Sequence, residues 1–227
     1  MSGSIVSPKL RARVRGVATP IAVGFGRLGL TPNHLTLIGF GIAVGAAAAA
    51  WQEAWLIAGV LVLFGGAFDL FDGALARATG RTSTLGAFMD SVADRAGEGV
   101  VYVGIIAGCL WGGLREGVVL GAAAMAAAFL VSYVRAKSES LGFTPGTGMA
   151  AVGLAPREIR IVILALGLML AGQGPVNLIP PAGSTCIESC IQSSGMILLG
   201  ALGLITVLAT VTTIQRIVHV MRQTPQE

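Results

Sequence analysis

Six long apolar runs constrain the fold of this chain more than any other feature of its sequence. A helix that crosses a bilayer needs roughly 20 predominantly apolar residues, and backbone groups in lipid must be hydrogen-bonded within the spanning segment. The runs cover approximately residues 35–51, 55–71, 88–111, 118–134, 159–170 with its flanks, and 196–218. Only 11% of the residues are charged, against about 25% in soluble domains. The sequence therefore predicts an all-α integral membrane protein with six transmembrane helices.

The segment before the first run is basic and partly apolar. Its basic residues are Lys9, Arg11, Arg13, Arg15 and Arg27. Their interleaving with aliphatic residues favours an N-terminal amphipathic helix on an anionic membrane surface, with a disordered basic tail as the alternative. No signal peptide is apparent, because a clean apolar core with a cleavage site is missing. We expect an amphipathic juxtamembrane segment at 1–30, a six-helix membrane domain at 31–222 and a C-terminal tail at 223–227.

The basic residues also indicate how the chain sits in the membrane. Of the 15 Lys and Arg residues, 14 fall before the first run, at the second–third and fourth–fifth junctions, or at the C-terminus, and only Arg115 falls on the other side. The positive-inside rule then predicts a multi-pass protein of the cell membrane with both termini cytoplasmic. The opposite loop, about residues 172–194, contains Cys186 and Cys190, which could form a disulfide or remain free thiols.

All four aspartates of the chain lie within 26 positions. Asp69 and Asp72 are spaced i, i+3 and Asp90 and Asp94 are spaced i, i+4, so each pair shares one face of a helix. The polar link at 80–84 should let the two helices run antiparallel and bring the acidic faces together. Four facing carboxylates repel one another unless cations hold them, and oxygen-rich sites suit divalent cations such as Mg²⁺ or Mn²⁺. Ionisable residues within membrane spans also favour a functional site.

The fixed positions of this stretch resemble the defining motif of the CDP-alcohol phosphatidyltransferases, which reads Asp-x2-Asp-Gly-x2-Ala-Arg-x8-Gly-x3-Asp-x3-Asp. The matching residues are Asp69, Asp72, Gly73, Ala76, Arg77, Gly86, Asp90 and Asp94. The resemblance implies that Asp69, Asp72 and Asp90 bind a pair of metal ions, Mg²⁺ or Mn²⁺. Asp94 would complete the metal site and act as the catalytic general base. The family resemblance also implies a homodimer.

The resemblance further implies a site for the donor lipid, CDP-diacylglycerol. Gly73 and Ala76 would leave room for the cytidine nucleotide beside Asp69, with Arg77 near its phosphates. Asn33, at the predicted start of the first membrane helix, would approach the same nucleotide. An acceptor hydroxyl would attack the phosphate that carries diacylglycerol, and CMP would leave. A carboxylate near the acceptor can take the hydroxyl proton, and metal charge can stabilise the leaving phosphate.

A second basic group bears on the acceptor alcohol. Arg135 and Lys137 end the fourth predicted helix, and Arg157 and Arg160 begin the fifth. Four cations near one cytoplasmic cavity favour a phosphorylated acceptor. These segments resemble those of the prokaryotic phosphatidylinositol-phosphate synthases, which implies myo-inositol 1-phosphate as the acceptor. Glycerol 3-phosphate, inositol and serine remain alternatives with the same chemistry.

A cation or proton transporter is the alternative from another functional class, since intramembrane aspartates also mark ion pathways. The sequence shows no inverted repeat of the kind common in transporters. We therefore expect an enzyme of phospholipid biosynthesis. Its expected partners are CDP-diacylglycerol, a phosphorylated alcohol and the lipid bilayer, and not nucleic acid.

Overall fold

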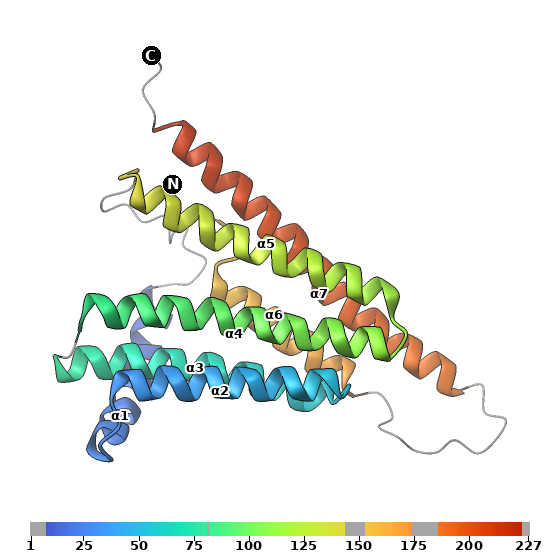
Figure 1. The fold of residues 1–227 in the computed structure, drawn as a ribbon, viewed down its shortest axis with the longest axis horizontal. Helices are drawn as coiled ribbons and strands as arrows, with labels where there is room; N and C mark the ends of the chain where they lie inside the picture. Colours follow the sequence, from blue (N-terminus) through green and yellow to red (C-terminus); the bar gives the residue numbers. More distant parts are fainter. Residues whose placement is uncertain (1–7, 81, 144–152, 174–185, 224–227) are drawn as a thin grey trace.

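The computed structural model of the chain is built from helices alone (Figure 1), and it describes residues 8–80, 82–143, 153–173 and 186–223. Over these residues it contains seven helices and no strand. The helices are α1 (Pro8–Arg27), α2 (Pro32–Trp51), α3 (Trp55–Thr79), α4 (Thr84–Trp111), α5 (Arg115–Ser140), α6 (Arg157–Ala171) and α7 (Cys186–Met221). The predicted all-α fold class is therefore confirmed.

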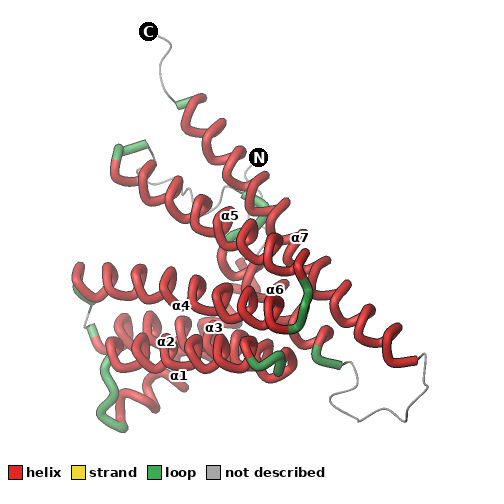
Figure 2. The backbone as a smooth tube through the Cα atoms, turned by 45° about the vertical axis from the view of Figure 1, so that its right-hand side comes forward, coloured by secondary structure: helices red, strands yellow, loops and turns green. Residues whose placement is uncertain are grey.

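Six of these helices form a closed ring. Helix α2 packs on α3 and α4, α4 on α5, α5 on α7, α7 on α6, and α6 returns to α3. Helix α1 packs on the outside of α3. Figure 2 shows α2, α3 and α4 running nearly parallel, with α5 and α7 inclined to them. Helix α6 is the shortest and begins partway along its neighbours (Figure 1), so its first turn lies beside the middle of α3 and α4.

Small residues allow the helices of the ring to approach closely. Gly104 of α4 lies against the carbonyl of Ala47 on α2 so tightly that a Cβ atom would collide with it. At the contact between α3 and α6, a Cβ atom on Gly59 would lie 2.7 Å from the carbonyl oxygen of Ala165. Contacts of this kind take the place of a hydrophobic driving force between helices in lipid. The buried core between the helices is accordingly rich in alanine.

Local signals set the turn between α3 and α4. Helix α3 ends at Thr79 and is capped by Gly80, whose φ of 66° is a left-handed conformation that glycine adopts without steric cost. Helix α4 begins after Ser83, whose hydroxyl accepts a hydrogen bond of 2.9 Å from the backbone N–H of Gly86. The turn is short, so the end of α3 and the start of α4 lie together. This arrangement brings the two halves of the acidic motif to the same region of the ring.

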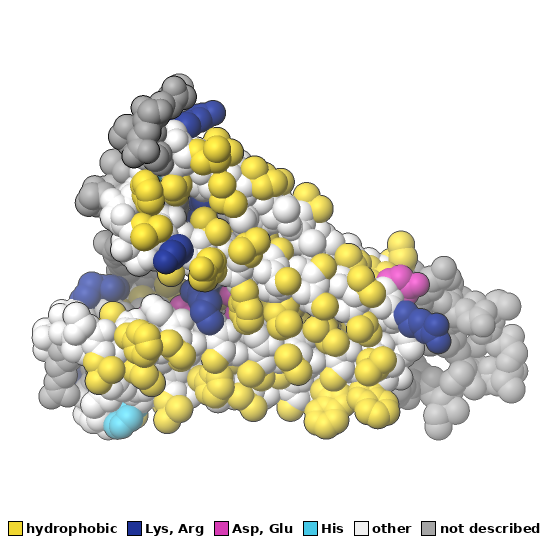
Figure 3. All heavy atoms as spheres, turned by 45° about the horizontal axis from the view of Figure 1, so that its top comes forward, with side chains coloured by type: hydrophobic (Ala, Val, Ile, Leu, Met, Phe, Trp, Pro, Cys, Tyr) yellow, Lys and Arg dark blue, Asp and Glu magenta, His cyan; other side chains and the backbone are white. Residues whose placement is uncertain are grey.

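Four helical segments of the described chain are long and apolar enough to cross a membrane: α2, α3, α5 and residues 195–221 of α7. Helix α4 is 28 residues long but carries Asp90, Asp94, Arg95 and Glu98 between its start and its middle, and α6 has only 15 residues. Large apolar side chains are exposed on the outer surface, among them Leu37, Ile57, Val103, Val119, Leu166 and Val207. Figure 3 shows hydrophobic side chains spread along the flank, with most of the visible basic side chains at one end.

Some sequence predictions concern parts that the structure does not describe. The side chains of residues 8–15, 17 and 186–194 are outside the described set, although their backbone is helical where given. The polar face predicted for the N-terminal segment and the pairing of Cys186 with Cys190 both fall there. Most of the predicted C-terminal tail, 224–227, lies outside the described residues as well.

Candidate active site

The four aspartates lie close together between two helices. Asp69 and Asp72 project from α3, Asp90 and Asp94 project from α4, and Asp90 is near enough to the other three to interact with them electrostatically. Asp72 is buried, with 5% of its surface exposed, and the others are partly buried. Burying several carboxylates together is unfavourable unless positive charge compensates them.

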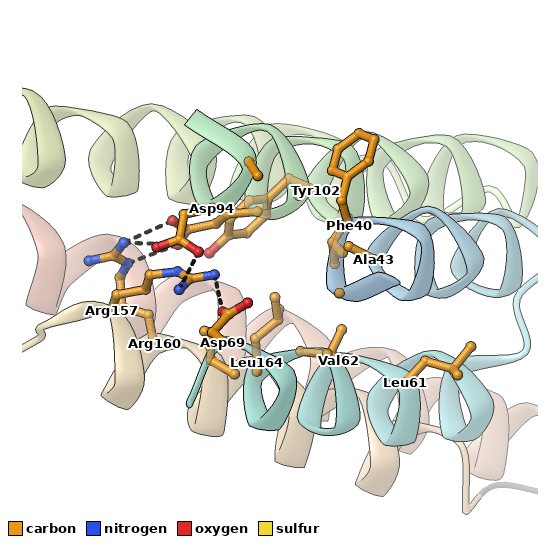
Figure 4. A pocket seen from close by; sticks show the side chains of 18 of the residues that line it. Phe40, Ala43, Leu61, Val62, Asp69, Asp94, Tyr102, Arg157, Arg160 and Leu164 are labelled. Atoms are coloured by element: carbon orange, nitrogen blue, oxygen red, sulfur yellow. Dashed lines mark hydrogen bonds and ion pairs between the residues drawn. The ribbon is translucent and has the colours of Figure 1, made fainter. Parts of the chain in front are cut away.

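A cavity of about 60 Å³ extends from this cluster into the ring. It is enclosed by α2, α3, α4 and α6 (Figure 4). Its polar lining consists of Thr36, Asp69, Asp94, Glu98, Tyr102, Arg157 and Arg160. The remainder of the wall is apolar and includes Phe40, Val62 and Leu164. The cavity is therefore amphipathic, with its charged groups around the first turn of α6.

Arg157 bridges the two halves of the acidic motif. Its Nη2 atom lies 2.7 Å from Oδ2 of Asp69 on α3, and its Nη1 atom lies 2.9 Å from Oδ1 of Asp94 on α4. About a fifth of the Arg157 side chain is exposed. Its Nε atom is buried without a hydrogen-bond partner among the described residues. Arg157 therefore neutralises two aspartates and retains one N–H group without a hydrogen-bond partner in the part of the chain that the structure describes.

Arg160, one turn further along α6, is held differently. Its guanidinium donates three hydrogen bonds of 2.9–3.1 Å to the carboxylate of Glu98 on α4, and both side chains are almost completely buried. A further bond of 3.1 Å runs from Nη1 to the carbonyl of Ala155, whose own N–H is bonded to Thr212 of α7. Arg160 thus fixes the start of α6 to both α4 and α7. The sequence alone suggests it for acceptor phosphate binding, together with Arg157.

The ion pairs leave two aspartates uncompensated. Arg95, Arg157 and Arg160 are connected to Asp69, Asp94 and Glu98 in one network of three positive and three negative groups. Asp72 and Asp90 are outside this network, among the residues that the structure describes. Asp72 and Asp90 therefore have no cationic partner in the described part of the chain.

The donor chemistry fits a divalent cation. Carboxylate oxygens are the ligands that Mg²⁺ and Mn²⁺ prefer, and Asp72 and Asp90 are not occupied by an arginine of the ion-pair network. In the described part of the chain, however, no three acidic, His or Cys side chains converge in the geometry of a metal site. Figure 4 shows the Arg157 guanidinium between Asp69 and Asp94, where it is ion-paired with both carboxylates.

Thr36 orients the buried Asp72. The Thr36 hydroxyl on α2 lies 2.9 Å from Oδ2 of Asp72 and 3.2 Å from the carbonyl oxygen of Pro32. A hydroxyl has one proton to donate, so the shorter contact to the charged carboxylate is the favoured bond. Sequence reasoning did not select Thr36, although it lies one helical turn beyond Asn33.

The residues expected at the nucleotide lie at the outer end of the acidic cluster. Arg77 is exposed, and its guanidinium folds back over Gly73, where a Cβ atom would lie 3.2 Å from Nη1. Asn33 is exposed at the start of α2, and its side-chain oxygen lies near Gly86 of α4. Ala76 is partly buried on the same helix as Gly73. These residues come from three helix ends that meet beside the aspartates.

The four cations expected at the acceptor do not form one group. Arg135 is exposed on α5 and pairs with Glu139 on the same helix, with Nε 2.9 Å from Oε1. Lys137 is exposed on the same stretch of α5. Only Arg157 and Arg160 line the cavity, and only Arg157 contacts the aspartates.

Two lining residues of α4 were not selected from the sequence. Glu98 and Tyr102 follow Asp90 and Asp94 at successive i, i+4 steps, so the four side chains form one stripe along α4. Continuing the helical spacing past the aspartates would have pointed to both residues. The partner of Glu98 is Arg160 on α6, which is 62 positions away in the chain.

Comparisons with known proteins agree on one family. The model of the CDP-alcohol phosphatidyltransferase family matches residues 29–215. The chain is 35% identical to an archaetidylinositol phosphate synthase of Methanothermobacter thermautotrophicus, over 95% of this chain and 94% of that protein. It is 33% identical to a phosphatidylinositol phosphate synthase of Streptomyces avermitilis, over 95% and 82% of the two chains.

The fold is also similar to a solved structure. The phosphatidylinositol phosphate synthase of Mycobacterium tuberculosis, in complex with manganese and citrate, matches with a TM-score of 0.72 and 26% sequence identity. The match covers 90% of this chain and 88% of that one. The same enzyme with CDP-DAG bound matches with a TM-score of 0.71.

Proposed function

Because the chain belongs to the CDP-alcohol phosphatidyltransferase family, we propose that it transfers a phosphatidyl group from CDP-diacylglycerol to myo-inositol 1-phosphate and releases CMP. The relatives named above are inositol phosphate lipid synthases, and one solved relative binds CDP-DAG. The observation that carries the proposal is the arrangement of Arg157 between Asp69 and Asp94. It puts a phosphate-binding group directly beside carboxylates suited to metal binding and proton transfer.

Asp69, Asp72, Asp90 and Asp94 would hold the divalent metal. Asp72 and Asp90 support this assignment most directly, because the arginine network leaves their charges uncompensated. When bound, Mg²⁺ or Mn²⁺ neutralises the pyrophosphate of the donor and the charge that develops on the departing CMP. The family resemblance favours two metal ions, and the negative charge of the donor pyrophosphate would help to balance the second.

The transfer itself requires a base and a positioned hydroxyl. The acceptor oxygen forms a bond to the phosphorus that carries diacylglycerol, and the bond from that phosphorus to the CMP phosphate oxygen breaks. CMP leaves with the electron pair, and the acceptor proton passes to a carboxylate oxygen of Asp94. Asp94 lines the cavity next to Arg157, which supports this role.

The donor nucleotide would lie at the outer end of the cluster. Gly73 and Ala76 leave space beside Asp69, and the exposed Arg77 can reach phosphate oxygens from the same helix. Asn33, near the start of α4, offers an amide that can bond the cytosine or ribose. The acyl chains of the donor would remain in the lipid along the apolar flank.

For the acceptor phosphate we propose Arg157 as the principal ligand. It lines the cavity, it is partly exposed, and its Nε atom lacks a partner. Arg135 and Lys137 would attract the phosphate from the exposed end of α5. Arg160 would hold the first turn of α6 in place and so position Arg157, since its own hydrogen bonds go to Glu98 and Ala155.

We further propose a cell-membrane protein with six crossings, made by α2 to α7, and with both termini and the active site on the cytoplasmic side. The clustering of 14 of 15 basic residues in four regions supports this orientation. Helix α1 would lie on the cytoplasmic surface, where Phe25 packs against Phe68 and Phe71 of α3. A homodimer is proposed from the family resemblance, and mass measurement in detergent would test it.

Release of CMP from CDP-diacylglycerol tests the proposed function. The purified protein is supplied with Mn²⁺ or Mg²⁺ and one acceptor at a time: inositol 1-phosphate, inositol, glycerol 3-phosphate or serine. We expect inositol 1-phosphate to be used most efficiently. Equal use of free inositol or serine would contradict the phosphate site, and preference for glycerol 3-phosphate would contradict the inositol acceptor. Full activity after exhaustive chelation would contradict the metal.

A further inference from the structure

Two buried polar atoms without hydrogen-bond partners lie at the same cavity. They are the hydroxyl of Tyr102 and the Nε of Arg157; in the described part of the chain, the two other such atoms belong to α7 and line no part of this cavity. A buried polar group without a partner costs on the order of 1–3 kcal/mol. Both residues line the same cavity, so a polar ligand that enters it is the nearest candidate partner for the two atoms.

The Tyr102 hydroxyl has no hydrogen-bond partner among the described residues. Tyr102 is completely buried on α4, one helical turn beyond Glu98 and two turns beyond Asp94. The nearest carboxylate on its stripe, Glu98, receives three hydrogen bonds from Arg160. A phenol buried among apolar residues normally finds a partner for its hydroxyl. At this position Phe would fill the same space without that cost.

The direction of the side chain places the hydroxyl near the reacting groups. Side chains of a helix lean toward its N-terminus, so the ring of Tyr102 extends back toward the turns that carry Glu98 and Asp94. Figure 4 shows the ring directed toward Asp94 and the arginines of α6. Tyr102 and Arg157 both line the cavity, and Arg157 lies at its charged end.

We propose that Tyr102 is a specificity-determining residue that hydrogen-bonds a ring hydroxyl of the polyol acceptor. The proposal rests on the proposed function, because it assumes an acceptor whose phosphate is held by Arg157 and whose reacting hydroxyl lies at Asp94. An inositol ring carries further hydroxyls that can extend past Asp94 into the cavity. Glycerol 3-phosphate has only one hydroxyl besides the reacting one, so it offers much less to a group deeper in the cavity.

A phenolic hydroxyl suits this task because it can both donate and accept a hydrogen bond. It is also neutral, so it recognises a hydroxyl without attracting a second phosphate. A site that bonds a substrate hydroxyl discriminates against analogues that lack it, since the buried group is then left without a partner. Tyr102 would thus favour a ring polyol over a short phosphorylated alcohol.

The test compares Tyr102→Phe with the wild-type enzyme, and uses Tyr133→Phe as the matched control. Tyr133 is exposed on α5, and Tyr102 and Tyr133 are the two tyrosines of the chain. For inositol 1-phosphate we expect Tyr102→Phe to raise KM about three- to tenfold, the effect of one neutral hydrogen bond. The KM for CDP-diacylglycerol and the low activity with glycerol 3-phosphate should change less than twofold. Tyr133→Phe should match the wild type throughout.

A second measurement uses inositol 1-phosphate analogues, each lacking one ring hydroxyl. One analogue should bind the wild type three- to tenfold more weakly than the parent and bind Tyr102→Phe as well as the parent does. Equal KM values for the two enzymes, or equal losses for every analogue in both, would overturn the role of Tyr102. Failure of the proposed function looks different, because the wild type would then transfer to no inositol phosphate at all.

Discussion

Arg157 on α6 lies 2.7 Å from Asp69 on α3, measured from Nη2 to Oδ2, and this ion pair closes the acidic cluster on the side of the cavity. The same guanidinium contacts Asp94. The arginine therefore supplies part of the positive charge that the cluster needs. A metal ion that bound Asp69 and Asp94 would compete with this contact and leave Arg157 able to bind an acceptor phosphate.

Replacing Arg157 tests this dual role. Loss of one charge-assisted contact costs about 1.5–3 kcal/mol, so Arg157→Gln should raise the acceptor KM roughly 10- to 150-fold. The KM for CDP-diacylglycerol should change much less. Because the competing cation is gone, Mn²⁺ should bind the variant more tightly in calorimetry. Arg115→Gln is the control, because Arg115 begins α5 at the end of that helix that is far from Arg135 and Lys137. Weaker Mn²⁺ binding in Arg157→Gln would contradict the competition.

Asp94→Asn tests the general base. We expect turnover to fall by about 10²–10⁴, the usual contribution of a positioned base, while binding of CDP-diacylglycerol is retained. A general base acts on the acceptor, so its loss should leave the affinity for CDP-diacylglycerol unchanged. Comparing this affinity with turnover therefore distinguishes a base from a metal ligand. If donor binding falls as far as turnover does, Asp94 is chiefly a metal ligand and another group takes the proton.

Thr36→Val tests whether the hydroxyl on α2 orients Asp72 for metal binding. Outer-shell partners of metal ligands typically affect metal affinity by about 10- to 100-fold, so the Mn²⁺ concentration for half-maximal activity should rise by that factor. Valine has nearly the same shape and removes only the hydrogen bond of 2.9 Å. Thr79→Val is the matched control, since among the described residues its hydroxyl bonds the backbone of Leu75 and no aspartate. Unchanged metal dependence in Thr36→Val would reject the positioning role.

Glu98→Gln should destabilise the fold strongly. It removes the charge that compensates the fully buried Arg160, and breaking a buried ion pair typically costs about 3–5 kcal/mol. The free energy of unfolding in detergent measures this effect. Glu139→Gln breaks the exposed pair with Arg135 and should cost at most about 1 kcal/mol. Equal stability of the two variants would mean that Arg160 is not a structural anchor.

Gly104→Ala tests the contact between α2 and α4. The added Cβ would collide with the backbone of Ala47, and overpacking of this kind typically costs about 1–3 kcal/mol. Gly41→Ala on α2 is the control, because no neighbouring atom lies within 4 Å of the place that its Cβ atom would occupy. That variant should be neutral or slightly more stable, since alanine is the better helix former. The midpoints of thermal unfolding in detergent compare the two.

The helices and the acidic motif were predictable because both depend on short-range pattern. Apolar runs of bilayer length specify helices wherever backbone groups must pair internally. The spacings of Asp69 with Asp72 and of Asp90 with Asp94 define a helix face without knowledge of other helices. The turn that brings the two pairs together is also local, with Gly80 at the end of α3 and Ser83 at the start of α4.

The roles of Arg157 and Arg160 could be separated only by the tertiary structure. They are three residues apart, equally basic and on the same helix, so the sequence gives no reason to distinguish them. The difference comes from α4, where Glu98 pairs with Arg160, 62 positions away, and Asp94 pairs with Arg157. The missing partner of Tyr102 has the same origin. Which donors of a side chain remain without a partner depends on the acceptor groups of the facing helix. Those groups are set by how the ring of helices closes.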